Sequence, residues 1–337
     1  MNIIYDGIIY KLQSSGGVSV YFNEIISRAK LLEKSVLLCD SNSIPDEFSD
    51  ISVKFTSRFL ERYRDVKCNI DGIFHSSYYR LPYNRKLKVI TTVHDFTYEK
   101  YVSGPAKWVH TWQKNRAIKN SDLVICVSQN TANDLMQYCP IDSSKIRVIH
   151  NGVSSSYFSI PELQTSNSNN VIFVGARNGY KNFGYAIKSI AHIPHLNLHI
   201  VGGGILNKNE KQLLDKYLPN RYKWLGRLSD QELNIAYNSA YALLYPSSYE
   251  GFGIPILEAM RAGCPVIAVN ISSIPEVAGD AAILVNSPSI DSFVEALKNI
   301  PLLREELILK GFNQVNKFSW ERCFEETLSV YNELSND

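Results

Sequence analysis

The chain has 337 residues, of which 45% are hydrophobic and 20% charged, with 18 Gly and 13 Pro. This composition excludes collagen, coiled coil and wholesale disorder, and the length predicts two domains of roughly 150 to 170 residues. The net charge of +2 hides an asymmetry, because residues 1–160 carry 20 Lys and Arg against 15 Asp and Glu (+5), whereas residues 161–337 carry 15 against 18 (−3).

Cysteine spacing and hydropathy narrow the class of protein further. The six cysteines lie far apart, without a C-x-x-C pair or a histidine at zinc-ligand spacing, so we predict neither a disulfide framework nor a metal site. No run approaches roughly 18 consecutive apolar residues, and Asp6 comes too early for a secretory leader. We therefore expect a cytoplasmic protein without a membrane span.

Short apolar runs alternate with segments of helical period along the chain, as is typical of parallel α/β sheets. The first half has predicted strands at Asn2–Asp6, Leu87–Val93 and Leu123–Val127, and predicted helices at Val20–Leu32 and Asn130–Tyr138. The second half has predicted strands at Val171–Val174, Leu196–Val201, Tyr222–Leu225, Tyr241–Tyr245 and Pro265–Val269. Its predicted helices are Gly184–Ala191, Lys208–Tyr217, Asp230–Asn238 and Pro255–Ala262. The pattern predicts two α/β units in tandem.

A polar segment separates the two halves. Ser154–Asn170 is rich in Ser and Asn and has no apolar periodicity, so we interpret it as the linker and place the boundary near residue 160. Ser319 is the expected N-cap of a last helix, which gives domains 1–160 and 161–318 and a terminal helix in 319–337. Ser128, and Ser229 with Glu232, are most simply helix caps as well.

Two glycine-rich turns follow predicted strands. Gly16-Gly17-Val18 precedes the first helix, and a glycine pair there lets backbone N–H groups approach a ligand at a positive helix end. A turn that only connects strand to helix explains the same residues. Gly202-Gly203-Gly204 lacks an acidic residue at dinucleotide-binding spacing, so we interpret it as a tight turn.

The segment from Tyr245 to Met260 carries the most specific pattern. A predicted strand ends at Tyr245, glycines free the backbone of the following loop, and Pro255 suits the first turn of a helix. Loop amides and the helix N-terminus predict an anion site, which is framed by Glu250 and Glu258, eight residues apart. An acid on a helix that is otherwise apolar is costly unless it bonds something. Compensation of the helix dipole is the alternative for this pair.

Glu250-Gly-Phe-Gly-x-Pro-x-x-Glu258 resembles the E-x7-E signature of the retaining glycosyltransferases of family 4. That family has GT-B architecture, an α/β fold in which two Rossmann-like α/β/α domains face a cleft and a C-terminal helix returns to the first domain. Other stretches resemble the family in order and spacing, over nearly the whole chain: Gly16–Val18, Thr92–Asp95, His150–Val153, Gly175–Asn182, Ser272–Ala282 and Phe318–Trp320. Tyr180 stands where the family usually has Arg, so only Arg177 and Lys181 carry over from that motif.

The resemblance implies a role for each matching residue of the second domain. Glu258 would bind the ribose hydroxyls, while Arg177 and Lys181 would bind the two phosphates and stabilise the leaving diphosphate in place of a metal. The donor sugar would contact Glu250 and the backbone of Gly251, Phe252 and Gly253. Lys181 as a solvated surface lysine is the plainer alternative.

In the first domain, the resemblance implies that Gly16 and Gly17 make room for the β-phosphate. His94 would lie near the exocyclic oxygens of the sugar and the reacting face, which completes a catalytic set of His94, Glu250, Arg177 and Lys181. A satisfied histidine at a strand end is the alternative for His94. Asp95 beside it is interpreted as structural, because a carboxylate next to His can serve only to orient it. Glu276 is left out of the catalytic set.

Residues 54–119 hold most of the positive charge, with 14 basic residues against 5 acidic ones, a local +9. Aromatic residues are interleaved with these cations, and Trp108 and Trp112 are four positions apart, as on one helix face. Such a surface suits an anionic membrane or a lipid diphosphate. The alternatives are that the tryptophans belong to the core and that the cations form a solvated face. A nucleic-acid partner is disfavoured, because no reader module accompanies the charge.

On this resemblance we predict a metal-independent hexosyltransferase without a cofactor that acts with retention, with GDP-mannose favoured over UDP-sugars as the donor. The expected acceptor is a glycan on polyprenyl diphosphate, in bacterial O-antigen or capsule assembly, with the protein peripheral on the inner face of the membrane. A nucleotide-sugar epimerase or hydrolase on the same scaffold, and a noncatalytic nucleotide-sugar-binding protein, stay as alternatives. A nicotinamide dehydrogenase is disfavoured, because the dinucleotide fingerprint is absent.

Overall fold

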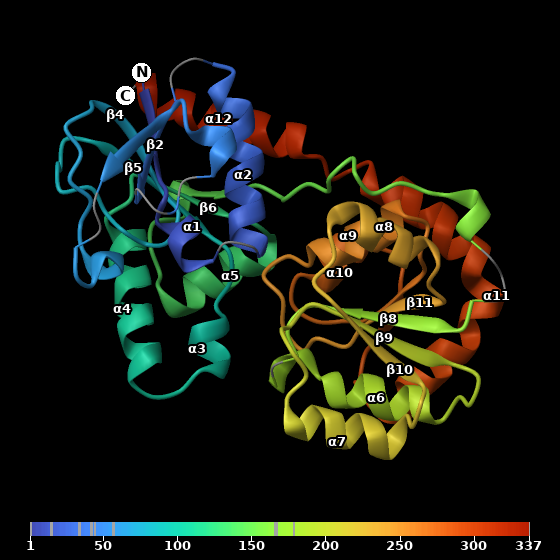
Figure 1. Ribbon diagram of the computed structural model, residues 1–337. Coiled ribbons are helices and arrows are strands. Elements are labelled where there is room, and N and C mark those ends of the chain that lie inside the picture. The colour runs from blue at the N-terminus through green and yellow to red at the C-terminus, as the bar shows by residue number, and fades with distance from the viewer. Residues whose placement is uncertain are drawn as a thin grey trace. The chain divides into compact units, whose positions relative to one another are not determined.

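The computed structural model divides into two compact units, residues 1–152 with 320–337 and residues 153–319 (Figure 1). It describes residues 2–336 except 14, 15, 33, 34, 41, 42, 44, 56, 57, 165–167 and 178. Asn178, in the motif Gly175–Asn182, therefore lies outside the described residues. Each unit is an α/β layer structure around a parallel sheet, as the alternating pattern predicted.

The first unit has a parallel sheet in the order β3-β2-β1-β4-β5-β6-β7. Its strands are β1 (Asn2–Asp6), β2 (Ser35–Asp40), β3 (Ser52–Phe55), β4 (Gly72–Ser76), β5 (Lys88–Val93), β6 (Leu123–Cys126) and β7 (Ile146–Val148). Its helices are α1 (Ile8–Leu12), α2 (Gly17–Lys30), α3 (Thr97–Tyr101), α4 (Pro105–Lys119), α5 (Gln129–Tyr138) and α12 (Trp320–Asn336). The order reverses direction between β1 and β4, as in doubly wound nucleotide-binding sheets.

The second unit repeats this winding in a sheet of order β10-β9-β8-β11-β12-β13. The strands are β8 (Asn170–Val174), β9 (Asn197–Val201), β10 (Tyr222–Gly226), β11 (Ala242–Tyr245), β12 (Val266–Val269) and β13 (Ile283–Val285). The helices are α6 (Phe183–Ala191), α7 (Lys208–Tyr217), α8 (Asp230–Asn238), α9 (Ile254–Arg261), α10 (Ile274–Ala278) and α11 (Ile290–Val315). The order reverses at the β8–β11 pair, so ligands are expected at the carboxyl ends of these two strands.

The boundary between the units lies at residue 153 and not near residue 160 as the composition suggested. The segment after Gly152 is held by side chains of α8. The amide N–H groups of Phe158 and Ile160 donate to Asn234 at 3.0 Å and Asn238 at 2.6 Å. A polar composition indicated a linker, but the polar groups of this segment are bonded to the second unit.

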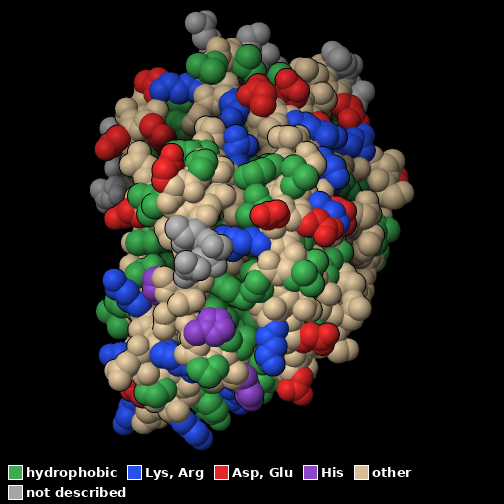
Figure 2. All heavy atoms as spheres, turned by 90° about the vertical axis from the view of Figure 1, so that its right-hand side faces the viewer, with side chains coloured by type: hydrophobic (Ala, Val, Ile, Leu, Met, Phe, Trp, Pro, Cys, Tyr) green, Lys and Arg blue, Asp and Glu red, His purple; other side chains and the backbone are tan. Residues whose placement is uncertain are grey.

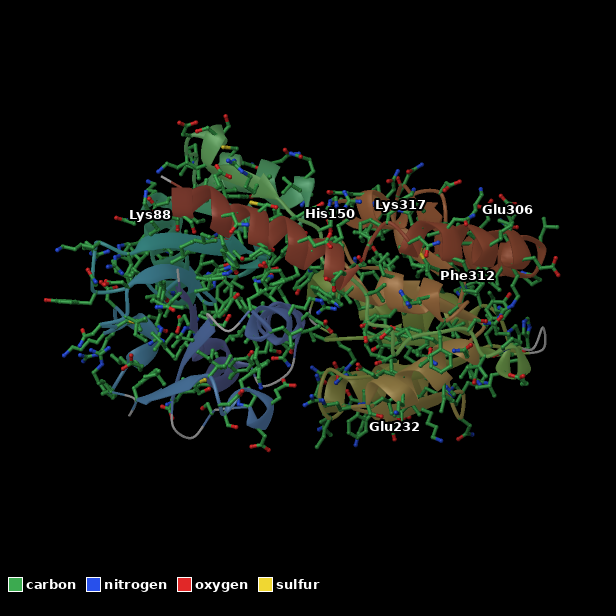
Figure 3. The ribbon with its side chains drawn as sticks, turned by 90° about the horizontal axis from the view of Figure 1, so that it is seen from above. Lys88, His150, Glu232, Glu306, Phe312 and Lys317 are labelled. Atoms are coloured by element: carbon green, nitrogen blue, oxygen red, sulfur yellow. The ribbon has the colours of Figure 1, made fainter. Side chains whose placement is uncertain are left out.

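The last helix, α12, packs against α2 and β4 of the first unit (Figures 1 and 3). Its Tyr331 hydroxyl lies 2.7 Å from His75 Nδ1, and His75 Nε2 lies 2.7 Å from the Thr92 hydroxyl in β5. Burial lowers the pKa of His75 to about 3, so this ring stays neutral and serves as a connector. The chain therefore closes the first unit with its own end, as the resemblance implied.

Two further features concern membrane-spanning helices and surface charge. Among the described residues, no helix has the length and apolar character that crossing a membrane requires. The face in Figure 2 shows Lys and Arg interspersed with Asp and Glu, so it presents no extended field of one sign.

Candidate active site

The loops that follow β8 and β11 meet at the switch point of the second sheet. Lys181 ends a single turn after β8, and Glu250 lies in the loop after β11. The Lys181 ammonium donates to Glu250 Oε1 at 2.6 Å, with side chains that are 13% and 12% exposed. The structure thus brings two predicted catalytic residues into one ion pair. A partly buried pair of this kind holds both groups in fixed positions.

Two serine hydroxyls form hydrogen bonds with the backbone of the Glu250 loop. Ser273 donates to the carbonyl oxygens of Glu250 at 2.9 Å and Phe252 at 2.8 Å. The Ser272 hydroxyl accepts from the Glu250 amide at 2.9 Å. Gly253 then adopts φ of +108°, which favours glycine, and is the N-cap residue of α9. The backbone around Gly251 is therefore fixed before any ligand arrives.

Asn182 ties the Lys181 turn to the Glu250 loop. Its side-chain amide donates to the Pro246 carbonyl at 2.9 Å and to the Ser248 hydroxyl at 2.6 Å. The Ser248 amide donates to the Tyr180 carbonyl at 2.8 Å. Tyr245 lies below the pair, where burial and then the Glu250 carboxylate raise its pKa well above the ordinary value. These hydrogen bonds join the two loops to each other.

Glu258 lies one turn inside α9 and is partly buried. The Tyr237 hydroxyl from α8 donates to Glu258 Oε2 at 3.0 Å, while the nearby Tyr157 hydroxyl donates to Asp230 at 3.3 Å. Burial, with a smaller effect from Asp230, raises the pKa of Glu258 to about 7, and the two tyrosine hydroxyls act in the opposite direction. When it is ionised, this partly buried carboxylate is a strong hydrogen-bond acceptor. Such a group suits hydroxyl groups of a ligand.

Arg177, which we predicted to bind the diphosphate, bonds the loop that follows β9. Its Nε donates to Glu210 at 2.9 Å, and its Nη1 donates to the Gly202 carbonyl at 2.8 Å. Its Nη2 donates to the carbonyls of Gly203 at 3.0 Å and Gly204 at 2.9 Å. All three glycines have positive φ, which turns their carbonyls toward the guanidinium. These bonds hold the loop, and the role of Arg177 at the diphosphate stays a prediction.

A direct test separates a purely structural role of Arg177 from its predicted role at the diphosphate, with Lys181 as the comparison. Arg177→Ala removes charged hydrogen bonds worth roughly 1.5 to 3 kcal/mol, so the melting temperature should fall by about 4 to 8 °C. The dissociation constant for nucleoside diphosphate should change by less than about threefold. Lys181→Ala should instead raise that constant about tenfold with a smaller effect on melting. Calorimetric melting and titration measure both quantities, and the opposite outcome restores the motif-based role.

Phe252, Gly16 and Gly17 were predicted to act through their backbone or through the space beside them. Phe252 is buried and packs edge-on against Phe318 at 5.8 Å, which leaves only its backbone for a ligand. Gly16 lies at the N-cap of α2 with extended backbone, and a Cβ there would collide with Gln13. A Cβ on Gly17 would meet nothing within 4 Å, so open space lies beside the first turn of α2.

His94 follows β5 in the first unit. Its ring packs edge-on against Tyr21 at 5.1 Å, and burial lowers its pKa to about 4. Its Nε2 is buried and has no hydrogen-bond partner among the described residues. The predicted alternative, a satisfied strand-end histidine, therefore does not fit. A buried, neutral and unpartnered nitrogen is ready to bond a ligand hydroxyl.

A buried lysine fixes the loop that carries His94. Lys114 of α4 donates to the Asp95 carbonyl at 2.9 Å and to Glu99 at 2.8 Å. Its ammonium also lies 3.9 Å from the centre of the Phe96 ring. The Asp95 side chain accepts from the Thr97 amide at 2.9 Å, so Asp95 shapes its own loop, consistent with the structural role we gave it.

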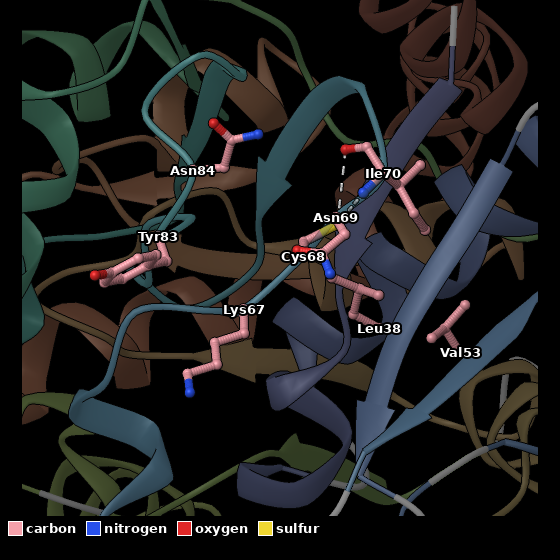
Figure 4. A pocket seen from close by; sticks show the side chains of 8 residues that line it. All are labelled: Leu38, Val53, Lys67, Cys68, Asn69, Ile70, Tyr83 and Asn84. Carbon is pink, nitrogen blue, oxygen red and sulfur yellow. Dashed lines mark hydrogen bonds between the residues drawn. The ribbon is translucent and has the colours of Figure 1, made fainter.

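Within the described residues, no group of three His, Cys, Asp or Glu side chains could hold a metal ion, and the six cysteines are buried free thiols. A cavity of about 590 Å³ in the first unit contains no predicted site residue (Figure 4). Its lining is Leu38, Val53, Lys67, Cys68, Asn69, Ile70, Tyr83 and Asn84.

The motifs did not identify the partners of the two glutamates. Tyr157, Tyr237, Ser272 and Ser273 each touch a predicted site residue and come from different parts of the chain. Ser272 and Ser273 lie in a stretch that resembled the family, which was the available signal. Nothing in the sequence around Tyr157 or Tyr237 indicated a contact with Glu258.

Two family models match most of the chain. The model of glycosyl transferases group 1 matches residues 159–307, and that of glycosyltransferase family 4 matches residues 42–157. The O-antigen chain mannosyltransferase B of Escherichia coli is 27% identical over 293 residues, 80% of this chain and 75% of that protein. The O-antigen chain mannosyltransferase RfbU of Salmonella typhimurium is 34% identical over 209 residues, 61% of this chain and 58% of that protein.

A solved structure shares the fold over the whole length. The Anabaena protein HepE, in complex with UDP-glucose, superimposes with a TM-score of 0.77 at 16% identity, covering 98% of this chain and 100% of that one. At this identity the likeness establishes architecture and says nothing of the substrate.

Proposed function

Since the chain belongs to the glycosyltransferases of family 4 and has the GT-B fold, we propose that it transfers a hexose with retention from a nucleotide sugar to a glycan acceptor. The observation that carries this proposal is the Lys181–Glu250 pair at the switch point of the second sheet, with Glu258 on the following helix. A cation for the diphosphate then lies beside an acid for the sugar, and an acid for the ribose lies on the helix that follows.

The proposed reaction uses these groups in turn. The bond from the anomeric carbon to the diphosphate oxygen breaks, and its electrons leave with the nucleoside diphosphate. The acceptor hydroxyl oxygen bonds to the same carbon, and its proton passes to the departing diphosphate. Lys181 and the N-terminus of α9 neutralise charge that grows on the leaving group, while Glu250 stabilises the positive charge that develops on the sugar. We assign His94 to a sugar hydroxyl.

Mannose from GDP-mannose is the donor we favour. Both mannosyltransferase relatives support it through their names, whereas the HepE complex supports UDP-glucose as the competing class. The same names support a glycan acceptor of O-antigen type, which we propose is linked to polyprenyl diphosphate. Such an acceptor would lie on the cytoplasmic face of the membrane, and we propose that the enzyme acts there.

The test is turnover with a panel of GDP-, UDP- and ADP-sugars and a synthetic lipid-diphosphate glycan, in excess EDTA. We expect transfer from GDP-mannose to persist without divalent metal, because Lys181 and a helix N-terminus already supply positive charge. Nuclear magnetic resonance of the product reports whether the anomeric configuration is kept. Free sugar or an epimer without acceptor dependence would instead favour a hydrolase or epimerase, and donor binding without turnover would favour a noncatalytic protein.

A further inference from the structure

Helix α4 buries several polar side chains and exposes its two tryptophans to solvent. Its buried face carries the polar residues His110, Gln113 and Lys114 beside the apolar Ala117 and Ile118. Its outer face carries Trp108 and Trp112, which are 77% and 60% exposed, with Val109 between them. Tryptophan is highly buried on average and polar residues rarely are, so this helix leaves its best apolar surface in water.

Polar bonds on the buried face hold α4 in this orientation. Lys114 bonds Glu99 and the Asp95 carbonyl, as described above. The Gln113 side chain donates to the Arg62 carbonyl at 2.7 Å. Rotating the helix to bury its tryptophans would break these bonds and leave a buried charge without a partner. The outward tryptophans are therefore a fixed feature of the fold.

The turn at residues 58–65 extends the same surface. Gln113 fastens this turn to α4, and Arg116 of α4 forms two hydrogen bonds with Asp65, at 2.7 and 2.8 Å. Phe59 is 81% exposed on this turn. Six exposed apolar side chains on the two segments make up what we call the aromatic patch: Phe59, Leu60, Tyr63, Trp108, Val109 and Trp112.

Positive charge surrounds the patch. Residues 100–121 contain no Asp or Glu. Arg62, Arg64, Lys107 and Lys119 form no ion pair with another described residue. Arg58, in contrast, is paired with Glu61 at 2.7 Å, so its charge is already compensated within the fold. Lys119 lies seven residues after Trp112 and thus on the same helix face.

We propose that the aromatic patch and its surrounding cations form a docking surface for an anionic lipid bilayer. Tryptophan and tyrosine rings settle at the headgroup level of bilayers, and unpaired Lys and Arg are attracted to anionic headgroups. A protein partner or a second copy of this chain would also cover the apolar residues. The unpaired cations beside them favour a surface that is both apolar and negatively charged.

This surface goes beyond the proposed transfer reaction, because binding to a bilayer needs neither donor nor acceptor. The experiment uses the full chain with vesicles of phosphatidylglycerol and phosphatidylethanolamine, and with vesicles of phosphatidylcholine alone, in sedimentation. We expect binding to the anionic vesicles that weakens as salt rises, and a blue shift of tryptophan fluorescence on binding. Trp320 is buried and cannot contribute to that shift.

The decisive variant is Trp108→Ala with Trp112→Ala, which changes only outward side chains. The partition coefficient onto anionic vesicles should fall at least tenfold, while the affinity for free nucleoside diphosphate stays the same. Leu302→Ala with Leu309→Ala is the matched control, because these leucines of α11 are 84% and 64% exposed in the second unit. Lys107→Glu with Lys119→Glu should also lower binding, and Lys208→Glu with Lys211→Glu on α7 is its charge control.

Three outcomes would overturn the proposal. The first is equal vesicle binding by the tryptophan double variant and the wild type. The second is binding to phosphatidylcholine that matches binding to anionic vesicles, which would remove the role of the cations. The third is the absence of vesicle binding together with a dimer that forms as the protein concentration rises and that the tryptophan double variant does not form. This result would assign the patch to a second copy of the chain.

Discussion

Glu250→Ala should lower kcat by about 100-fold or more while the affinity for free nucleoside diphosphate changes by less than about threefold. The carboxylate is assigned to the sugar, whose positive charge grows only as the bond to diphosphate breaks, so its loss is felt in the transition state. In the structure the Lys181 ammonium donates a hydrogen bond to the Glu250 carboxylate at 2.6 Å. Removing the acid leaves that cation available to phosphate, which is why nucleotide binding should survive.

A matched control separates this effect from the loss of any Glu–Lys pair. Glu306 bonds Lys310 at 2.8 Å on the outer face of α11, where both side chains are exposed (Figure 3). Glu306→Ala should leave kcat unchanged, because an exposed pair of this kind contributes at most about 0.5 kcal/mol to stability. Glu250→Gln keeps the shape and loses the charge, so it should behave like Glu250→Ala. If Glu250→Ala instead loses the nucleotide and keeps kcat, the acid binds ribose.

Local signals predicted the second unit better than the first. Its strands and helices fall within one or two residues of the expected bounds, except for β13, α10 and α11, which were not predicted. Capping explains part of this success, because Ser229 and Glu232 form the expected capping box and Ser128 caps α5. In helix α11, Pro301 obscured a single helix of 26 residues, since proline ordinarily ends a helical pattern.

Two elements of the first unit bury polar side chains beside apolar ones. Strand β4 buries His75 and Ser76, and α4 buries Gln113 and Lys114. Hydrophobic periodicity cannot detect such elements, because their burial depends on partners far away in sequence, such as Tyr331 for His75. The two alternatives for Trp108 and Trp112 were left open for the same reason, and only the structure shows that both point outward.

The residues of the candidate site also differ in how well the sequence predicted their positions. The spacing of Glu250 and Glu258 along one loop and helix predicted where both would lie, because the segment between them is short and its glycine and proline have fixed uses. Arg177 could not be placed from its motif, since its direction depends on three glycine carbonyls that lie 25 to 27 residues further along the chain. Tyr157 and Tyr237 escaped notice because they approach Glu258 from different segments.

Glu258 should make the affinity for the donor and the stability of the free protein respond to pH in opposite directions. Its pKa of about 7 exceeds its ordinary value of 4.5. Between these values the folded protein binds the proton and the unfolded chain does not. This contribution to stability is therefore complete below pH 4.5 and is lost as pH rises through 7. In the role that we propose for Glu258, ribose hydroxyls donate to its carboxylate, so nucleotide affinity should rise over the same upper range.

Glu258→Gln should remove both responses. The variant should be more stable than the wild type at pH 8, by on the order of 1 to 3 kcal/mol, because it buries no charge. Its dissociation constant for nucleoside diphosphate should be one to two orders of magnitude higher at that pH, since neutral hydrogen bonds replace charge-assisted ones. With Glu258→Ala the loss of affinity should be at least as large, and kcat at saturating donor should change less than in Glu250→Ala.

Tyr237→Phe tests the assignment without touching the acid. The tyrosine hydroxyl donates to Glu258 at 3.0 Å and lowers its pKa, so the variant should move the midpoint of the affinity curve to higher pH. Calorimetric titration of nucleoside diphosphate from pH 5.5 to 9 measures that midpoint in wild type, Tyr237→Phe and Glu258→Gln. An unchanged midpoint in Tyr237→Phe, together with wild-type affinity in Glu258→Gln, would mean that Glu258 braces the two tyrosines and binds no ribose.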